Sequence, residues 1–376
     1  MIYRIYGTTG IEVSAIGFGG MRFVHQDNVD ECASLVKAAY DKGVNYFDTA
    51  PGYGKSEELF GAAFKLMNKT RDEKPFYVST KSMKSEPELI RKDLETSLTR
   101  MNLDYIDFYH FWYVLSLEDY RSRRTKGALK EFERLKDEGL IKHICVSSHM
   151  TGSDIEKMLH DYPFEGVLLG YSAMNFAYRE AGLDAAAKLS RGVAVMNPLG
   201  GGIIPQHPER FGFVKSRQSE SVVEAALRFL INDPRITIVL AGLSSQQQLA
   251  EAIRAAQGYK KIPDETISRI RANLKKAFNE LCTSCQYCDK CPQGIAVPKM
   301  MDSYNQYMLS GNSADMMERL LMHWGIELED KYLDNCTQCG LCEEACTQKL
   351  PVRQRLKDIR AEIKKFLAAQ PKQDKQ

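Results

Sequence analysis

The sequence predicts an α/β protein, a (β/α)8 TIM barrel followed by a small, mainly α-helical domain. Three observations lead to this prediction. Short apolar runs alternate with helical patterns eight times between Ile16 and about Gly258. Most of these runs are nearly continuous in apolar residues, which is typical of strands buried on both faces of a parallel sheet. Beyond the alternating part, eight of the ten cysteines fall within two short segments.

The expected strands follow one another along the chain, and they cover residues 14–19, 44–49, 76–81, 105–112, 141–148, 166–172, 193–198 and 236–242. Helical stretches separate them, such as one that stops at Gly43 and one that has Pro87 in its first turn. Eight such units match a closed barrel. A doubly wound open sheet is the alternative, but no G-x-G-x-x-G follows the first strand. Residues 5–13 predict a hairpin around Gly7 and Gly10 that closes the bottom of the barrel.

The composition changes after the barrel pattern ends. Residues 260–281 are charged and helical, and they lead into the first group of cysteines. The chain then continues through a Met-rich helical part and the second group of cysteines to a polar tail. We therefore predict two domains, a barrel over residues 1–265 and a cysteine-rich domain over residues 266–376.

Composition and charge exclude several classes of function. The net charge of the 376 residues is +2, which implies no polyanionic partner, and we expect no nucleic-acid binding. No apolar run approaches the roughly 18 residues of a membrane span, and the first ten residues lack the apolar core of a signal peptide. We therefore expect a cytoplasmic protein with no membrane association.

Polar side chains follow the C-terminal ends of the expected strands, where barrels of this kind hold their active sites. Asp48 and Lys81 end two strands, and Tyr53 lies just beyond the first of them. A free tyrosine has a pKa of about 10, which is too high for efficient proton transfer near neutrality. A nearby ammonium lowers that pKa, and a carboxylate keeps the ammonium charged and in place. An aspartate that ends a strand is by itself more often a helix cap than a catalytic residue, but Asp48, Tyr53 and Lys81 together predict a catalytic group.

The run DYIDFYHFWYV at 104–114 places Phe108, His110 and Trp112 on one face of a strand. This face should point into the barrel, with Trp112 at the mouth and His110 one layer lower. His110 is then either a core histidine bonded to a neighbouring backbone group or a catalytic residue. The catalytic role requires a shift or a bulge at the end of the strand that brings the imidazole to the substrate.

Several motifs carry a resemblance to a known family. GVNYFDTAPGYGKSEELFGAAFK (43–65), STK (79–81), LDYIDFY (103–109), VMNPLGGG (195–202) and AGLSSQQQL (241–249) resemble the aldo-keto reductases over residues 1 to about 258. The resemblance implies hydride transfer between a nicotinamide cofactor and the carbonyl or alcohol of a small molecule. It makes Tyr53 the general acid, Lys81 the neighbour that lowers its pKa, and Asp48 the partner of Lys81.

The resemblance also implies a cofactor site across the barrel mouth. Ser147 and Ser148 match positions that hold the nicotinamide carboxamide, and the loops at 198–202 and 242–248 would cover the pyrophosphate and the adenosine. The implied cofactor-binding residues are Gly20, Met21, Asp48, Ser147, Ser148, Tyr171, Leu199, Gly202, Gly242, Leu243, Ser244 and Gln248.

Three departures from the family pattern affect these expectations. Trp112 stands where the family usually has its fourth catalytic residue, a histidine, and His110 comes two residues earlier. We take His110 as the displaced fourth catalytic residue. Leu168 stands where a glutamine is common. No Lys or Arg occurs between Gly242 and Ile253 to hold the 2′-phosphate of NADPH. Lys215 and Arg217 could hold this phosphate instead. Both NAD(H) and NADP(H) are therefore possible cofactors, with NAD(H) favoured.

The clustered cysteines predict iron–sulfur chemistry. CTSCQYCDKCP contains Cys282, Cys285, Cys288 and Cys291, and CTQCGLCEEAC contains Cys336, Cys339, Cys342 and Cys346. These runs resemble the dicluster ferredoxins, in which each run supplies three thiolates to one [4Fe–4S] cluster and its fourth thiolate to the other. The resemblance implies two [4Fe–4S] clusters. Zinc is the alternative, but its sites typically pair two separated C-x-x-C motifs.

Three functions stay open at this stage. The favoured one is a nicotinamide-dependent oxidoreductase. The second is an electron-transfer enzyme in which the clusters, and not a nicotinamide, deliver the electrons, with an electron-carrier protein as a possible partner. The third is a non-catalytic binding subunit, which the presence of the Asp48, Tyr53 and Lys81 set disfavours.

Overall fold

A computed structural model describes the chain except for residues 68–72, 174–178, 258–259, 278–279, 329–332 and 370–376. The chain divides into two compact units. The first contains Met1–Leu199 and Phe211–Lys276, and the second contains Gly200–Arg210 and Ala277–Gln376. The predicted division between residues 265 and 266 stays a prediction.

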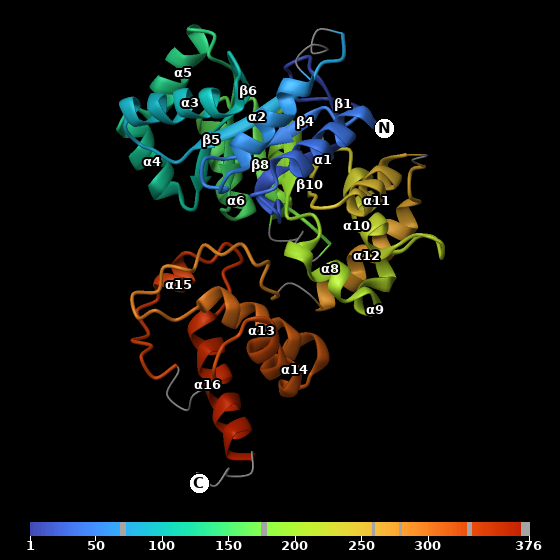
Figure 1. Cartoon of the computed structure of the whole chain (residues 1–376), viewed down its shortest axis with the longest axis vertical. Coiled ribbons are helices and arrows are strands. Elements are labelled where there is room, and N and C mark those ends of the chain that lie inside the picture. Colours follow the sequence, from blue (N-terminus) through green and yellow to red (C-terminus); the bar gives the residue numbers. More distant parts are fainter. Residues whose placement is uncertain (68–72, 174–178, 258–259, 278–279, 329–332, 370–376) are drawn as a thin grey trace. The chain divides into compact units, whose positions relative to one another are not determined.

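The first unit is a closed barrel of eight parallel strands, which confirms the predicted fold class (Figure 1). The strands pair in the order β10-β3-β4-β5-β6-β7-β8-β9 and back to β10. Their bounds are β3 (Ile16–Gly19), β4 (Tyr46–Asp48), β5 (Tyr77–Ser82), β6 (Ile106–Val114), β7 (Ile141–Ser148), β8 (Gly166–Gly170), β9 (Gly192–Met196) and β10 (Ile238–Gly242).

Helices surround the strands of this unit (Figure 1). They are α1 (Val29–Asp41), α2 (Ser56–Met67), α3 (Pro87–Met101), α4 (Leu117–Thr125), α5 (Ala128–Asp137), α6 (Gly152–Asp161), α7 (Glu180–Lys188), α10 (Val222–Ile231), α11 (Gln246–Ala256) and α12 (Asp264–Ala277), with short 3-10 helices η1 (Gly20–Arg22) and η5 (Gly212–Val214). Their starts follow the local sequence. Asn28, Ser116, Thr151 and Ser221 accept a hydrogen bond from the backbone of the third residue that follows, which satisfies an otherwise free N–H.

The predicted N-terminal hairpin is present as β1 (Tyr3–Ile5) paired antiparallel with β2 (Glu12–Ser14). Tyr6 and Val13 from this hairpin join the apolar interior of the barrel. The Tyr6 ring lies 4.5 Å from that of Phe108, centroid to centroid. The hairpin therefore closes the barrel at the end where the strands begin, and it leaves the C-terminal ends of the strands for the site.

Strand β6 differs from its prediction at its end, because it runs to Val114 and its pairing with β7 changes register between Phe111 and Val114. His110 lies before this irregularity, in regular register with Lys81 on one side and Cys145 on the other. The irregularity therefore lies beyond His110, and the shift that was expected to bring the His110 imidazole to the substrate is not found at this residue.

The second unit has its own apolar core, which includes Met300, Met316, Leu320 and Ile359. Its helices are α13 (Val297–Ser310), α14 (Ser313–Glu318), the π-helix η6 (Arg319–His323), α15 (Leu341–Glu344) and α16 (Val352–Ala369). The chain between β9 and η5 contributes η4 (Gly200–Gly202), α8 (Ile203–Gln206) and α9 (Pro208–Phe211). Across the described part of both units, no helix combines the length and the apolar character needed to cross a bilayer.

Candidate active site

Asp48 and Lys81 form a buried ion pair at the C-terminal ends of β4 and β5. Lys81 is fully buried, and its Nζ donates to Asp48 Oδ1 at 2.8 Å, to Asp48 Oδ2 at 2.7 Å and to the Thr49 carbonyl at 2.6 Å. Ser79, which is paired with Asp48 in the sheet, donates its hydroxyl to Asp48 Oδ2 at 2.8 Å. Burial lowers the pKa of Lys81, and the Asp48 carboxylate opposes that shift. All three donors of the ammonium are thereby directed at oxygen atoms.

Tyr53 lies in the turn after β4 and above this pair. Its ring centroid is 5.3 Å from Lys81 Nζ, and its ring meets the edge of Trp112 at 5.9 Å between centroids. Trp112 itself is 4% exposed. The Tyr53 ring thus lies near both an ammonium and an apolar indole, and the catalytic role predicted for Asp48, Tyr53 and Lys81 stays a prediction.

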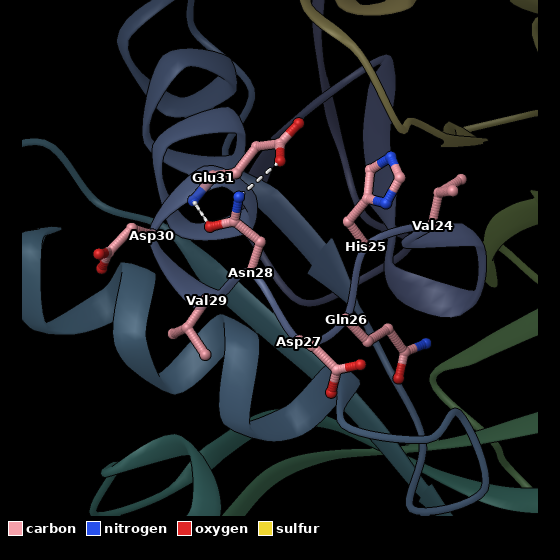
Figure 2. A pocket seen from close by; sticks show the side chains of 8 residues that line it. All are labelled: Val24, His25, Gln26, Asp27, Asn28, Val29, Asp30 and Glu31. Atoms are coloured by element: carbon pink, nitrogen blue, oxygen red, sulfur yellow. Dashed lines mark hydrogen bonds between the residues drawn. The ribbon is translucent and has the colours of Figure 1, made fainter.

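Figure 2 shows a pocket bounded by residues 24–31, in the loop that leads into α1. Asn28 and Glu31 bond to each other there, since Asn28 Oδ1 accepts from the Glu31 amide at 3.2 Å and Asn28 Nδ2 donates to Glu31 Oε2 at 2.9 Å. Gln26 Oε1 accepts from the Lys55 amide at 2.8 Å, and Lys55 Nζ also pairs with Asp27. These contacts tie the loop to the turn that carries Tyr53. No predicted catalytic or cofactor residue lines the pocket.

His110 is fully buried, and neither of its ring nitrogens has a hydrogen-bond partner among the described residues. Burial lowers its pKa well below the usual value, and the Lys81 ammonium lowers it further. The Val146 backbone, which lies close to the imidazole, opposes this shift. The imidazole is therefore neutral, and it lies beside a backbone group, as a core histidine would.

Ser147 and Ser148 differ in what they can offer a cofactor. Ser147 Oγ is buried without a partner among the described residues. Ser148 Oγ already donates to the Val114 carbonyl at 3.3 Å and accepts from the Met150 amide at 3.1 Å. Leu168 is paired with Ser147 in the sheet and belongs to the apolar interior. Of the two serines, Ser147 is therefore the available hydrogen-bonding group.

Other predicted cofactor residues lie at the ends of β3, β8, β9 and β10. Gly20 is buried, whereas Met21 is exposed. Tyr171 is buried, and its hydroxyl donates to Glu180 Oε2 on α7 at 3.0 Å. Ser244 donates from both its amide (2.9 Å) and its hydroxyl (3.0 Å) to Gln248 Oε1. Leu199 ends the first segment of the barrel unit, Gly202 belongs to the second unit, and Leu243 is buried beyond β10.

The structure adds Arg22, which sequence reasoning missed. A Cβ on Gly242 would lie 2.8 Å from Arg22 Cγ, so the Arg22 side chain lies directly against the end of β10. Residues 242–253 do not reveal this cation, because Arg22 belongs to η1, which follows β3. The pairing of β3 with β10, which closes the barrel, brings the two together. Lys215, the substitute considered from sequence, donates instead to the Gln218 carbonyl at 3.0 Å.

The sequence analysis also did not reveal the contact between Arg179 and His149. Arg179 is fully buried, and it donates to the Gly170 carbonyl at 3.1 Å and to the His149 carbonyl at 3.3 Å. It thereby braces the ends of β7 and β8. Burial lowers the pKa of His149 to about 3, and the Arg179 guanidinium adds to this effect.

Cysteines of the two runs come together in one group around Cys282. Cys285, Cys288 and Cys346 all lie near enough to Cys282 to raise the pKa of its thiol, after burial, which is the main cause. Cys346 comes from the second run, so this group combines three thiols of one run with the last thiol of the other. Cys336 has the same effect on Cys342 in the second group.

The local backbone suits thiolate ligands. The Ser284 amide donates to Cys282 Sγ at 3.4 Å, and the Leu350 amide donates to Cys346 Sγ at 3.4 Å. Gln338 Nε2 donates to Cys336 Sγ at 3.2 Å. Among the described residues, no three His, Cys, Asp or Glu side chains converge as closely as a single metal ion requires. A cube carries its thiolates on four separate irons, so it needs a wider spacing than zinc.

Comparison with known proteins decides the family. The aldo/keto reductase family matches residues 15–275, which is most of the chain. This chain belongs to the aldo/keto reductase family. A 4Fe-4S dicluster domain matches residues 281–351. This reductase therefore carries an iron–sulfur domain after its barrel.

Individual relatives agree with this result. L-galactose dehydrogenase of Arabidopsis thaliana is 27% identical over 316 residues, covering 73% of this chain and 95% of that protein. Probable aldo-keto reductase 1 of Glycine max is 29% identical, covering 78% of this chain and 88% of that protein. Among solved structures, the holo form of aldo-keto reductase AKR11C1 from Bacillus halodurans has a TM-score of 0.61 at 22% identity, covering 74% of this chain and 98% of that one. That likeness confirms the fold.

Proposed function

We propose that this oxidoreductase transfers a hydride between a nicotinamide cofactor and the carbonyl or alcohol of a small molecule, with Asp48, Tyr53 and Lys81 as its catalytic group. The observation that carries the proposal is the buried Lys81 ammonium, held by Asp48 at 2.7 Å and lying 5.3 Å from the Tyr53 ring centroid. A cation so close favours the phenolate and makes the phenol a better acid.

The catalytic roles follow from this geometry. The nicotinamide would supply the hydride to the carbonyl carbon, and the Tyr53 hydroxyl would give its proton to the carbonyl oxygen. Asp48 fixes the Lys81 ammonium so that the charge does not move during proton transfer. His110 is proposed as a fourth catalytic residue, a neutral imidazole that would donate a hydrogen bond to the same oxygen from its regular position in β6 beside Lys81, without the shift that the sequence led us to expect. Among the described residues, neither ring nitrogen has a well-formed hydrogen bond, which supports this role.

The residues around the mouth fit a dinucleotide. Ser147 Oγ supplies a free hydrogen-bonding group for the carboxamide. The Ser244 and Gln248 pair offers neutral polar groups, which suit the ribose hydroxyls of NADH better than a 2′-phosphate. Arg22 beside Gly242 offers a charge that suits the pyrophosphate, which NADH and NADPH share. Together with Gly20, Met21, Tyr171, Leu199 and Leu243, these residues form the proposed cofactor site of the barrel unit, with NADH favoured, and the role of Gly202 stays a prediction from the sequence.

The second unit is proposed to hold two [4Fe–4S] clusters in crossed ligation. Cys282, Cys285, Cys288 and Cys346 would hold the first cluster, and Cys291, Cys336, Cys339 and Cys342 the second. Anaerobically purified protein should then contain about eight iron and eight acid-labile sulfide per chain. Stoichiometric zinc without sulfide would contradict this. A cytoplasmic location is part of the proposal, because reducing compartments keep such thiols available.

One observation favours a second candidate function. Cys339 is exposed, and Leu341 beside it is 50% exposed, so a cluster held there could exchange electrons with a carrier protein. In this case the clusters, and not the nicotinamide, would supply the electrons for carbonyl reduction. Turnover with chemically reduced clusters and without a nicotinamide would favour this candidate.

The Tyr53→Phe variant tests the main proposal. Turnover of a panel of small aldehydes should fall at least a hundredfold, while the Kd for NADH stays within twofold, because the change removes the proton but almost no contact area. Tyr113→Phe is the matched control, since Tyr113 lies next to Trp112, with ring centroids 5.3 Å apart, and has no proposed role. Turnover of Tyr53→Phe within a few-fold of the wild type would overturn the proposal.

His110→Phe tests the fourth residue separately. We expect at least a hundredfold loss of turnover with unchanged NADH affinity and full cluster content. A rate within threefold of the wild type would make His110 a structural residue, and the enzyme would then work with three catalytic residues.

A further inference from the structure

Arg355 lies in the first turn of α16 and carries a charge that is buried in the second unit, where the residue is 3% exposed. Its Nη2 donates to the Glu280 carbonyl at 2.6 Å, and its guanidinium carbon lies 5.1 Å from the centroid of the Tyr304 ring. Among the described residues, its Nη1 has no hydrogen-bond partner, and no carboxylate forms an ion pair with the guanidinium. Burying a cation costs free energy unless negative charge lies beside it, so this position calls for a negative group.

The neighbours of the guanidinium are proposed ligands of the first cluster. Cys282 comes two residues after the carbonyl that Nη2 binds, and both Cys282 and Cys346 lie near enough to Arg355 for their charge to act on it. Cys285 Sγ and Thr347 Oγ1 lie 3.4 Å apart, which brings the end of the second cysteine run against the first run. Cysteine binds iron as the thiolate, so a cluster held by these residues would supply the negative group that Arg355 requires.

The loop that carries Cys282 is held by contacts within the second unit. Asn305 Oδ1 accepts from the Cys282 amide at 2.8 Å, and Asn305 Nδ2 donates to the Cys282 carbonyl at 2.8 Å. Thr283 lies against Gly201, which has φ +72°, and a Cβ at this glycine would come within 2.1 Å of the Thr283 carbonyl oxygen. Only glycine allows the two backbones to approach this closely. The position of Cys282 near the guanidinium is therefore set by the protein itself.

The ligands proposed for the second cluster have different surroundings. Cys339 is exposed, so water reaches a cluster held there. Two other arginines of α16 are already paired beside the second cysteine run, since Arg353 Nε donates to Glu343 Oε2 at 2.7 Å and Arg360 forms an ion pair with Asp334. Their charges are thereby compensated. The charge of the buried arginine on the same helix is not compensated by a described carboxylate, and it lies beside the first cluster site.

We propose that Arg355 is the counter-charge of the first iron–sulfur cluster and sets its reduction potential. Reduction by one electron, taken from a chemical reductant such as dithionite, adds one negative charge to a cluster. Cys282 and Cys346 are buried, and burial opposes the added charge, whereas a neighbouring cation favours it. The guanidinium therefore raises the potential of the first cluster and leaves that of the second nearly unchanged. The inference rests on the proposed content of two clusters.

The test is a potentiometric titration of the anaerobic, cluster-loaded full-length chain with dithionite, followed by electron paramagnetic resonance. Arg355→Gln removes the charge and keeps an amide that can donate to the Glu280 carbonyl, whereas Arg355→Lys keeps the charge and loses the planar guanidinium. Lys357→Gln is the matched control, because Lys357 is exposed on the same helix, where water and salt screen its charge. Iron and acid-labile sulfide are measured in every protein before the titration.

The wild type and Lys357→Gln should have the same potentials for both clusters. In Arg355→Gln, the potential of one cluster should fall by about 59 mV, which corresponds to a tenfold smaller equilibrium constant for its one-electron reduction. The constant of the other cluster should stay within twofold of the wild type. Arg355→Lys should restore most of the loss. Cys285→Ser changes a proposed ligand of the first cluster alone, so the potential that it alters should be the one that falls in Arg355→Gln.

Unchanged potentials in an Arg355→Gln protein with full iron and sulfide would overturn the counter-charge and leave the proposed clusters intact. Equal shifts of both potentials, or the same loss in Arg355→Lys as in Arg355→Gln, would also overturn it, because a general disturbance of the unit and not the charge would then be the cause. If Arg355→Gln retains only half of its iron, full retention in Arg355→Lys supports the proposal, and the same half-loss there overturns it. A wild type without acid-labile sulfide would overturn both this inference and the proposed clusters.

Discussion

Replacing Lys81 with Met separates the stability of the barrel from its catalysis. The change removes the ammonium that donates to Asp48 at 2.7 and 2.8 Å and leaves the carboxylate buried, where the Ser79 hydroxyl still donates to it at 2.8 Å. Breaking a buried ion pair by removing one partner costs about 3–5 kcal/mol. For a domain of this size, each kcal/mol lowers Tm by roughly 2–4 °C, so we expect a drop of about 10 °C.

A second change should restore the stability but not the activity. In Lys81→Met with Asp48→Asn, the buried carboxylate becomes a neutral amide that can still accept from the Ser79 hydroxyl. Replacing both partners of a buried pair is often close to neutral, so we expect the double variant to recover to within about 1 kcal/mol of the wild type. Turnover should stay at least a hundredfold down in both variants, since the Tyr53 phenol has lost its cation.

Urea unfolding can be followed in the barrel alone. The chain has two tryptophans, Trp112 in the barrel and Trp324 in the second unit, so all proteins are compared in a Trp324→Phe background, where the emission reports on Trp112. A free energy of unfolding for Lys81→Met that is less than 1 kcal/mol below that of its parent would refute the buried-pair reasoning. A double variant that turns over at the parent rate would refute the catalytic role of Lys81.

Three further predictions concern charges that the structure places in unexpected positions. Because the pKa of His149 is about 3 in the folded protein and about 6.5 when unfolded, its stability contribution is complete above pH 6.5 and is lost as the pH falls toward 3. At pH 5 the loss is about 2 kcal/mol, so in urea unfolding the His149→Asn variant should lose about 2 kcal/mol less stability than the wild type between neutral pH and pH 5. Arg22→Gln should raise the Kd for NADH and for NADPH about tenfold each by fluorescence titration, leaving their ratio within twofold; a loss confined to NADPH would place Arg22 at the 2′-phosphate instead. Arg355→Met should shorten the half-life of cluster absorbance in air several-fold, because the buried guanidinium lies near Cys282 and Cys346, while exposed Lys357→Met on the same helix should leave it unchanged.

Sequence patterns predict the barrel well, because each strand is a local apolar run. The strand expected at 141–148 has these bounds in the structure, and that expected at 166–172 ends two residues earlier, at Gly170. The proximity of Asp48, Tyr53 and Lys81 could also be predicted, since strand ends in a parallel barrel meet at one edge. The end of β6 could not be predicted, because an uninterrupted aromatic run does not reveal where the register changes.

The features missed from sequence depend on tertiary contacts. Arg22 reaches the end of β10 only because the first and last strands pair. The association of Gly201 with Thr283 depends on a backbone approach between segments about 80 residues apart, and a glycine-rich run alone does not reveal it. The complete burial of His110 likewise depends on packing from several strands, which the alternation along one strand cannot establish.

The most direct test of the account is an anaerobic titration of the cluster-loaded protein with NADH, followed by protein fluorescence and cluster absorbance together, with a small aldehyde added at the end. We expect saturable binding of one NADH per chain, unchanged cluster absorbance throughout, and oxidation of NADH in proportion to the aldehyde consumed. Absence of NADH binding, with aldehyde reduction that instead bleaches chemically reduced clusters, would contradict it.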